Sequence, residues 1–106
     1  MQKILSIDTS SNKQIQVSLT TGKEVYCLSS DATNLKSQVV LLLIDEILKE
    51  NKLKPTDLTQ IEVNLGPGSF TGLRVGVAVA NTLGYILKIP VNGNKVGDLA
   101  EPLYNN

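Results

Sequence analysis

The sequence predicts a small α/β domain built on a mixed β-sheet. Short apolar segments alternate with polar turns over the first thirty residues, as the strands of a meander do. An amphipathic helix pattern follows, and a glycine-rich turn at residues 66–72 then joins a strand to a second helix. The length of 106 residues is that of one domain, so we expect residues 1–106 to form a single lobe around one core.

The first half of the predicted sheet is an antiparallel meander. Residues 3–8 read as a buried strand ahead of a polar turn at residues 8–12. Apolar and polar side chains alternate over residues 14–20, a turn follows at residues 21–23, and residues 25–28 continue with strand-like composition. We therefore expect three strands that pair in sequence order.

A helical pattern covers residues 37–51. One face carries the apolar residues Val40, Leu43, Ile44, Ile47 and Leu48. Three further apolar side chains widen this stripe beyond what one core needs, namely Val39, Leu41 and Leu42. Two interpretations stay open: a helix clamped between the sheet and a second helix, or a helix shared with another chain.

The second half of the chain supplies one more strand and one more helix. A short helical turn at residues 55–58 precedes a strand at residues 60–65, which leads into the glycine-rich turn. Either Ser69 or Thr71 can cap the helix that follows, which we expect to end near Leu87.

The predicted sheet ends with a short edge strand at residues 89–91, where Pro90 is tolerated. Residues 94–103 form at most a weak helix that ends before Pro102. The resulting order βββαβαβ, with a mixed sheet and a helix on at least one face, is the order of the ribonuclease H-like fold.

The glycine-rich turn is a candidate anion site, because it opens a helix whose first amides are free to bind a phosphate. It lacks the lysine of a GxxxxGK[ST] loop and does not match GxGxxG, so neither nucleotide fingerprint is present. The polar turn after the first strand could face the same phosphate, although Asp8 could equally cap its own turn. The candidate phosphate-binding residues are Asp8, Thr9, Ser10, Gly66, Gly68 and Ser69.

Small residues recur every fourth position along the second helix, at Gly72, Gly76, Ala80 and Gly84. Glycine inside a helix costs about 1 kcal/mol relative to alanine, so we expect a close approach here, by the sheet in preference to another chain. Arg74 lies in the first turn of this helix, where its positive charge interacts unfavourably with the helix dipole. A bound phosphate or a partner carboxylate would offset this cost. The alternative is a solvated arginine or an ion pair with an acid such as Glu62.

Composition excludes several classes of site. Ten basic and ten acidic residues balance, which leaves no electrostatic footprint for stand-alone nucleic-acid binding. Histidine is absent and Cys27 is the only cysteine, so we expect no disulfide, no metal, no catalytic residues and no cofactor. We also expect no signal peptide and no membrane span, and a cytoplasmic location.

Two residue strings together are specific. Ile4-Leu5-Ser6-Ile7-Asp8-Thr9-Ser10 and Gly66-Pro67-Gly68-Ser69-Phe70-Thr71-Gly72-Leu73-Arg74-Val75-Gly76 resemble the corresponding strings of the TsaB (YeaZ) family. The resemblance implies the actin-like, sugar-kinase-like ATPase superfamily fold and a non-catalytic subunit that supports a TsaD-like protein. That complex, with a TsaE-like ATPase, would threonylcarbamoylate the adenosine beside the anticodon, so tRNA would be met only through the complex.

The resemblance also implies an interaction surface and the number of lobes. The family pairs through its first helices, which suggests Val39, Leu42, Leu43 and Glu46, together with Arg74, as interface residues for a TsaD-like partner or a homodimer. Members usually carry a second lobe, and this chain stops about where that lobe would begin, so we expect a single N-terminal lobe without an interlobe cleft. The alternative function is a stand-alone nucleotide- or phosphate-binding module of the same fold.

Overall fold

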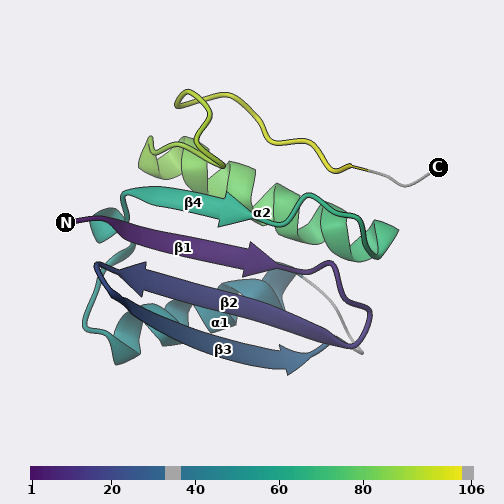
Figure 1. The fold of residues 1–106 in the computed structure, drawn as a ribbon, viewed down its shortest axis with the longest axis horizontal. Coiled ribbons are helices and arrows are strands. Elements are labelled where there is room, and N and C mark those ends of the chain that lie inside the picture. Colours follow the sequence, from purple (N-terminus) through teal and green to yellow (C-terminus); the bar gives the residue numbers. More distant parts are fainter. Residues whose placement is uncertain (33–36, 104–106) are drawn as a thin grey trace.

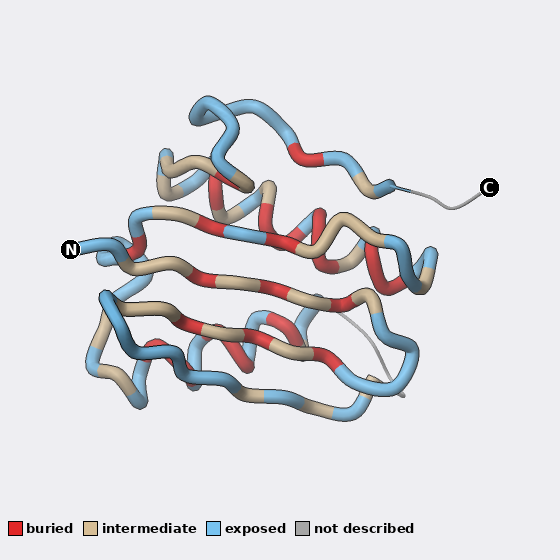
Figure 2. Tube along the Cα trace, in the orientation of Figure 1, coloured by how far each residue is buried: buried red, intermediate tan, exposed pale blue. Residues whose placement is uncertain are grey.

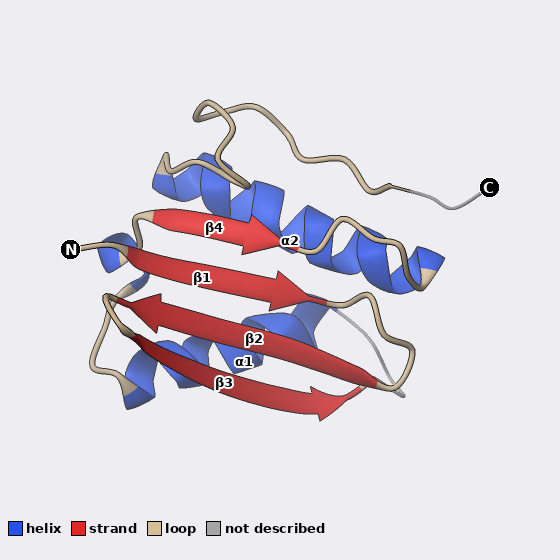
Figure 3. Ribbon diagram, viewed as in Figure 1, coloured by secondary structure: helices blue, strands red, loops and turns tan. Residues whose placement is uncertain are grey.

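The structure is a computed structural model that describes residues 1–32 and 37–103. It has two layers, a sheet and a pair of helices that both lie behind the sheet in Figures 1 and 3. The strands are β1 (Lys3–Asp8), β2 (Gln14–Thr21), β3 (Glu24–Asp31) and β4 (Gln60–Val63), and the helices are α1 (Ser37–Glu50), the short 3-10 helix η1 (Pro55–Asp57) and α2 (Phe70–Leu87).

The sheet has the strand order β3-β2-β1-β4. β1 pairs antiparallel with β2, and β2 pairs antiparallel with β3, which confirms the predicted meander. β4 lies parallel to β1 on the other side, after a crossover through α1 and η1. The mixed sheet is therefore confirmed, and α1 lies against β2 and β3 while α2 lies against β4 and β1.

Buried residues recur along β1, β2 and β4 and along both helices (Figure 2), and they form one hydrophobic core. Alternate strand residues point into it, because successive side chains of a strand lie on opposite faces. The five apolar residues predicted for the inner face of α1 are all buried, as are Leu5, Ile7, Ile15, Val17, Leu19, Ile61 and Val63 of the sheet. The other face of the sheet carries no helix in the described residues, and it is polar, with Ser6, Gln16, Ser18 and Glu62.

The predicted edge strand at residues 89–91 shrinks to a single parallel bridge between Ile61 and Val91. Pro90 has no N–H to donate, and the segment is enclosed by Lys88 and Asn92, which both adopt the left-handed conformation. Beyond this bridge, the side chain of Asn92 pairs with the backbone of Val63 in place of a further strand residue. Asn92 Oδ1 accepts from the Val63 N–H (2.8 Å), and Asn92 Nδ2 donates to the Val63 carbonyl (3.1 Å).

The weak helix considered for residues 94–103 does not form. Gly97 takes a positive φ of 96° inside this segment, which interrupts any helix there. Asn81 of α2 instead holds the segment by exchanging two 2.9 Å hydrogen bonds with the backbone of Ala100.

α2 begins at the predicted place, because the Ser69 side chain accepts a hydrogen bond from the Gly72 N–H at 3.3 Å. The helix ends at Leu87 as expected. By length and apolar composition alone, α2 resembles a membrane-spanning helix. Its inner face packs into the core between the layers, and a core helix can have the same length and composition.

Candidate functional site: a closed turn and an open helix surface

The glycine-rich turn lies directly against the polar turn that follows β1. The Ser69 N–H donates to the Ser10 carbonyl at 2.8 Å. At Gly68 a Cβ atom would lie 2.6 Å from both the Cβ and the carbonyl oxygen of Ser10, so only glycine allows this approach. The two strings that resemble TsaB proteins are thus brought together in space.

Thr9 fastens α2 to this junction. Its side chain is fully buried, and its Oγ1 donates to the Gly72 carbonyl at 2.5 Å. A Cβ atom at Gly76 would collide with Thr9 Oγ1, so a glycine is needed one turn farther along the helix. The Thr9 hydroxyl is therefore already engaged within the chain.

Asp8 and Asn64 complete a chain of polar contacts. Asp8 Oδ1 accepts from the Ser10 N–H (2.9 Å) and from Ser10 Oγ (2.6 Å). Asn64 Nδ2 donates to Ser10 Oγ (3.2 Å), while Asn64 Oδ1 accepts from the Gly66 N–H (2.9 Å). Sequence reasoning missed Asn64; a short polar amide immediately after a strand was the available signal.

The pKa of Asp8 follows from this network. Partial burial by itself would raise the pKa, but the hydrogen bonds from the Ser10 side chain, the Ser10 backbone and Asn64 together outweigh it. The net result is a pKa below the ordinary value, so Asp8 is a carboxylate at neutral pH.

All six residues suggested for phosphate binding gather at this junction, which we call the turn lock (Asp8–Ser10 with Gly66–Ser69). The amides of Gly66 and Ser69 already donate within the chain, as do the hydroxyls of Thr9 and Ser10. The negative charge of Asp8 also disfavours an anion there. This geometry favours a structural role for the six residues.

The small-residue stripe of α2 serves packing within the chain. Gly72, Gly76, Ala80 and Gly84 are all buried. At Gly84 a Cβ atom would lie 2.5 Å from the side chain of Val91, so the stripe brings the helix close to Thr9 at one end and to the bridge segment at the other. The sequence expectation of packing on the sheet is confirmed.

The residues suggested as an interface differ in exposure, and only three of the five are exposed. Leu42 is 68% exposed, and Glu46 and Arg74 are also exposed. Val39 is half-buried against the core. Leu43 is only 8% exposed and belongs to the core of this chain, which leaves little of it for a partner.

A groove runs between α1 and α2. One hollow of about 280 Å³ is lined by Ser37 and Leu41 of α1 and by Ala78, Val79, Thr82 and Leu83 of α2. A second hollow of about 450 Å³ shares Ser37 and Ala78 and continues to Thr71, Arg74 and Val75. Sequence analysis named Leu41 and, on α2, Arg74, but it missed the other α2 residues of the groove, because the helix positions that face a neighbouring helix depend on how the two helices pack.

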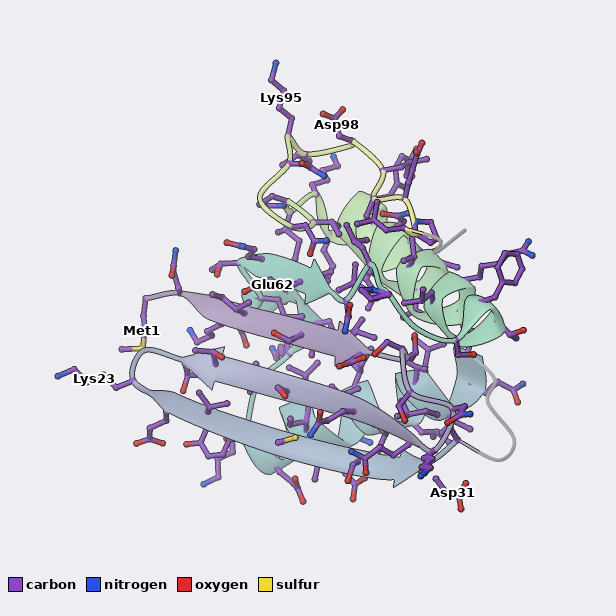
Figure 4. The ribbon with its side chains drawn as sticks, turned by 45° about the vertical axis from the view of Figure 1, so that its right-hand side comes forward. Met1, Lys23, Asp31, Glu62, Lys95 and Asp98 are labelled. Atoms are coloured by element: carbon purple, nitrogen blue, oxygen red, sulfur yellow. The ribbon has the colours of Figure 1, made fainter. Side chains whose placement is uncertain are left out.

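Arg74 lies at the end of this groove. Its guanidinium is 5.4 Å from the centre of the Phe70 ring, one helical turn earlier, so the cation rests on an aromatic face. The ion pair considered with Glu62 does not form, because Glu62 projects from the helix-free face of the sheet (Figure 4). Phe70 is itself 56% exposed and adds apolar surface beside the arginine.

The described residues hold no arrangement of three His, Cys, Asp or Glu side chains close enough to bind a metal ion. The one salt bridge that we find among them joins Lys49 to Asp45 on the exposed side of α1, at 2.9 Å. The two places of interest are therefore the turn lock, which is closed, and the helix groove, which is open.

Comparison with known proteins identifies the family. Residues 29–95 match the family model described as TsaD, tRNA N6-adenosine threonylcarbamoyltransferase. The chain is similar to the tRNA threonylcarbamoyladenosine biosynthesis protein TsaB of Buchnera aphidicola subsp. Schizaphis graminum, with 34% identity over 90 residues, covering 85% of this chain and 42% of the relative. The TsaB protein of Bacillus subtilis is 33% identical over 116 residues, covering 96% of this chain and 49% of the relative.

Solved structures agree with the sequence relatives. YeaZ from Pseudomonas aeruginosa superposes with a TM-score of 0.81 at 26% identity, covering 90% of this chain and 44% of that one. The chain thus spans less than half the length of these relatives. The fold is the ribonuclease H-like α/β fold predicted from the element order, and it belongs to the actin-like superfamily that the resemblance implies. The chain belongs to the TsaD family as that family model defines it, and within it to the TsaB (YeaZ) proteins.

Proposed function

We propose that this chain is a TsaB-type subunit that binds a TsaD-like protein and supports threonylcarbamoylation of the adenosine beside the anticodon of tRNA. In this proposal the chain acts as a single N-terminal lobe and contributes no catalytic residue. The chemistry lies in the TsaD-like protein, a TsaE-like ATPase takes part in the complex, and tRNA is contacted through the complex. The setting is the cytoplasm.

The observation that carries the proposal is the open groove between α1 and α2 with its apolar rim. We call the groove, together with the exposed apolar side chains next to it in the chain, the helix-groove surface. Leu41, Arg74, Ala78 and Thr82 line the hollows, while Leu42 and Phe70 line neither and are exposed beside Leu41 and Arg74. Leu42 and Phe70 expose more than half of their side-chain area, and Leu41 exposes 45%. Burying such apolar area stabilises an association by about 25 cal/mol per Å², so this surface gains from a partner.

The chemistry of the surface also suggests the kind of partner. An apolar centre with one cation at its edge fits a helix pair that presents apolar side chains and a carboxylate opposite Arg74. Arginine on an aromatic ring keeps both its charge and its planar donors available for such a carboxylate. A non-catalytic role also agrees with the turn lock, where the hydroxyls of Thr9 and Ser10 and the amides of Gly66 and Ser69 donate within the chain.

Co-elution tests the proposal. The 106-residue chain and the TsaD-like protein of its own source are mixed, and the complex is weighed by light scattering during size-exclusion chromatography. We expect a stable complex of defined mass. Separate elution of the two proteins at all concentrations would refute the proposal.

A matched pair of variants locates the surface. Leu42→Asp places a charge on the helix-groove surface, and we expect it to abolish complex formation. Leu99→Asp makes the same change at a residue of nearly equal exposure (67%) on the C-terminal segment, and we expect it to leave the complex intact. Equal loss of binding in both variants would show that the groove is not the docking site.

A further inference from the structure

The outer edge of β3 is long, and among residues 1–32 and 37–103 no other strand pairs with it. β3 borders the sheet, at the bottom of Figure 1, and it pairs with β2 over all eight residues without a bulge. Natural proteins usually blunt such edges with proline, lysine, a bulge or a very short strand. Residues 24–31 contain neither proline nor lysine, and Val25 is 66% exposed.

The backbone groups that face outward can be identified. Gly22 has a φ of 63° at the first position of a two-residue turn between the paired residues Thr21 and Glu24. In a hairpin with such a turn, the two residues that flank the turn form a hydrogen-bonded pair. Even-numbered residues of β3 therefore bond to β2, and the Ala32 N–H continues this pattern by donating to Lys13. The N–H and C=O groups of Val25, Cys27 and Ser29 consequently point to the free edge.

We propose that two copies of this chain associate edge to edge through β3, antiparallel about a two-fold axis at Cys27. In this register Cys27 faces the second copy's Cys27, and Val25 faces the second copy's Ser29, each as a hydrogen-bonded pair. The result is one continuous eight-stranded sheet. The proposal stands independently of the docking function of the helix groove.

Charge selects this register. Lys23, in the turn just before β3, and Asp31, the last residue of β3, lie at opposite ends of the strand (Figure 4). A pairing centred on Cys27 therefore brings Lys23 of each copy to the second copy's Asp31. Shifting the centre to a point between Cys27 and Leu28 would set Glu24 opposite Asp31, two like charges. Cross-strand pairs of opposite charge stabilise a sheet and like pairs destabilise it.

The helices fit the same arrangement. α1 lies across β2 and β3. Strands pair at 4.7–4.9 Å, so edge pairing brings the two α1 helices to a separation of about 10 Å, which is a helix packing distance. Leu41 faces α2 in the groove, and the 100° step of a helix places Val39, Leu43 and Glu46 on the opposite flank, toward the β3 edge. The flank with Val39 would thus be covered by its symmetry mate, while the helix groove stays open.

Sedimentation equilibrium on Cys27 variants tests the proposal. Cys27 is exposed, so Cys27→Asp and Cys27→Lys keep the fold, which circular dichroism checks. Each variant alone sets like charges at the axis, and we expect its dimer dissociation constant to rise about tenfold or more. An equimolar mixture sets Asp against Lys and should recover the dimer. A wild-type chain that stays monomeric, or a dimer that both variants leave unchanged, would overturn the proposal.

Two further measurements test whether self-association uses the β3 edge and not another surface. Thr82→Asp and Thr82→Lys put the same charges in the helix groove, and dimerisation should be unaffected by either. Amide hydrogen exchange of the wild-type dimer should show concentration-dependent protection at Val25, Cys27 and Ser29. Rapid exchange of these three amides in a dimeric sample, or a dimer lost in the Thr82 variants alone, would show that self-association uses another surface.

Discussion

The turn lock and the helix-groove surface make opposite use of their residues. In the turn lock the hydroxyls of Thr9 and Ser10 and the amides of Gly66 and Ser69 all have partners within the chain. On the helix-groove surface, Leu42 and Phe70 are more than half exposed. The family string is thus divided between two tasks: its glycines and Ser69 maintain the fold at the turn lock, while Phe70 and Arg74 of the same string lie on the surface open to a partner.

The largest effect on stability should come from adding a methyl group inside the lock. Gly76→Ala gains about 1 kcal/mol of helix propensity but forces a Cβ onto the fully buried Thr9, and overpacking costs about 1–3 kcal/mol. With the Thr9 hydrogen bond also disturbed, we expect a net loss of about 2 kcal/mol in the free energy of unfolding, measured by urea denaturation.

A double variant checks the cause of that loss. Thr9→Ala removes the atoms that collide with the new methyl group. The Gly76→Ala, Thr9→Ala double variant should lose about 1 kcal/mol less free energy of unfolding than the sum of the two single losses, because contacting residues are coupled. Strictly additive losses would mean that the methyl group at position 76 does not clash with the Thr9 side chain.

A smaller effect should follow from removing only the Thr9 hydroxyl. Thr9→Val keeps the shape of the side chain but loses the bond to the Gly72 carbonyl, and we expect a loss of about 1 kcal/mol in the same denaturation experiment. Thr9→Ser keeps the hydroxyl and serves as the control for the bond itself. If Thr9→Val were as stable as the wild-type chain, the Thr9 bond would have no part in the lock.

A pH dependence should distinguish Asp8 from an ordinary surface acid. Its folded-state pKa lies below the unfolded value of about 3.9, so its stabilising contribution is complete above that value and is lost as pH falls through the folded pKa. Asp8→Asn should therefore reduce stability near neutral pH, and the difference from the wild-type chain should shrink in acid. A carboxyl resonance of Asp8 that titrates above the ordinary range would contradict the hydrogen-bond network.

The smallest expected signal is the response of the chain to nucleotide. Since four donors of the turn lock, the hydroxyls of Thr9 and Ser10 and the amides of Gly66 and Ser69, are engaged and Asp8 is negative, calorimetry with ATP or inorganic phosphate should show no binding heat. Saturable binding that Asp8→Asn or Ser10→Ala alters would show that the turn lock binds phosphate, and it would favour the stand-alone phosphate-binding module.

Most of the fold follows from local patterns that the structure leaves intact. The inner face of α1 was predictable because five apolar residues recur at helical spacing, and the start of α2 because serine is a strong helix cap. The strand at residues 89–91 was overestimated, since its pairing depends on Pro90 and on two left-handed residues outside it.

The site was less predictable because tertiary contacts decide it. Glycine spacing indicated a close approach at Gly68 and Gly76, but the partners, Ser10 and Thr9, lie more than fifty residues away in the sequence. The amide side chains of Asn64, Asn81 and Asn92 each join separate segments, and no local pattern marks which asparagine does so. Likewise, the α2 wall of the groove is set by the packing of two helices.

One affinity measurement tests the central claim most directly. The TsaD-like protein of the same source is titrated with the wild-type chain, with Leu42→Asp from the helix-groove surface and with Asp8→Asn from the turn lock, under conditions where all three are folded. The account predicts equal affinity for the wild-type chain and Asp8→Asn, and a loss of at least about tenfold for Leu42→Asp. Retained binding by Leu42→Asp with lost binding by Asp8→Asn would contradict it.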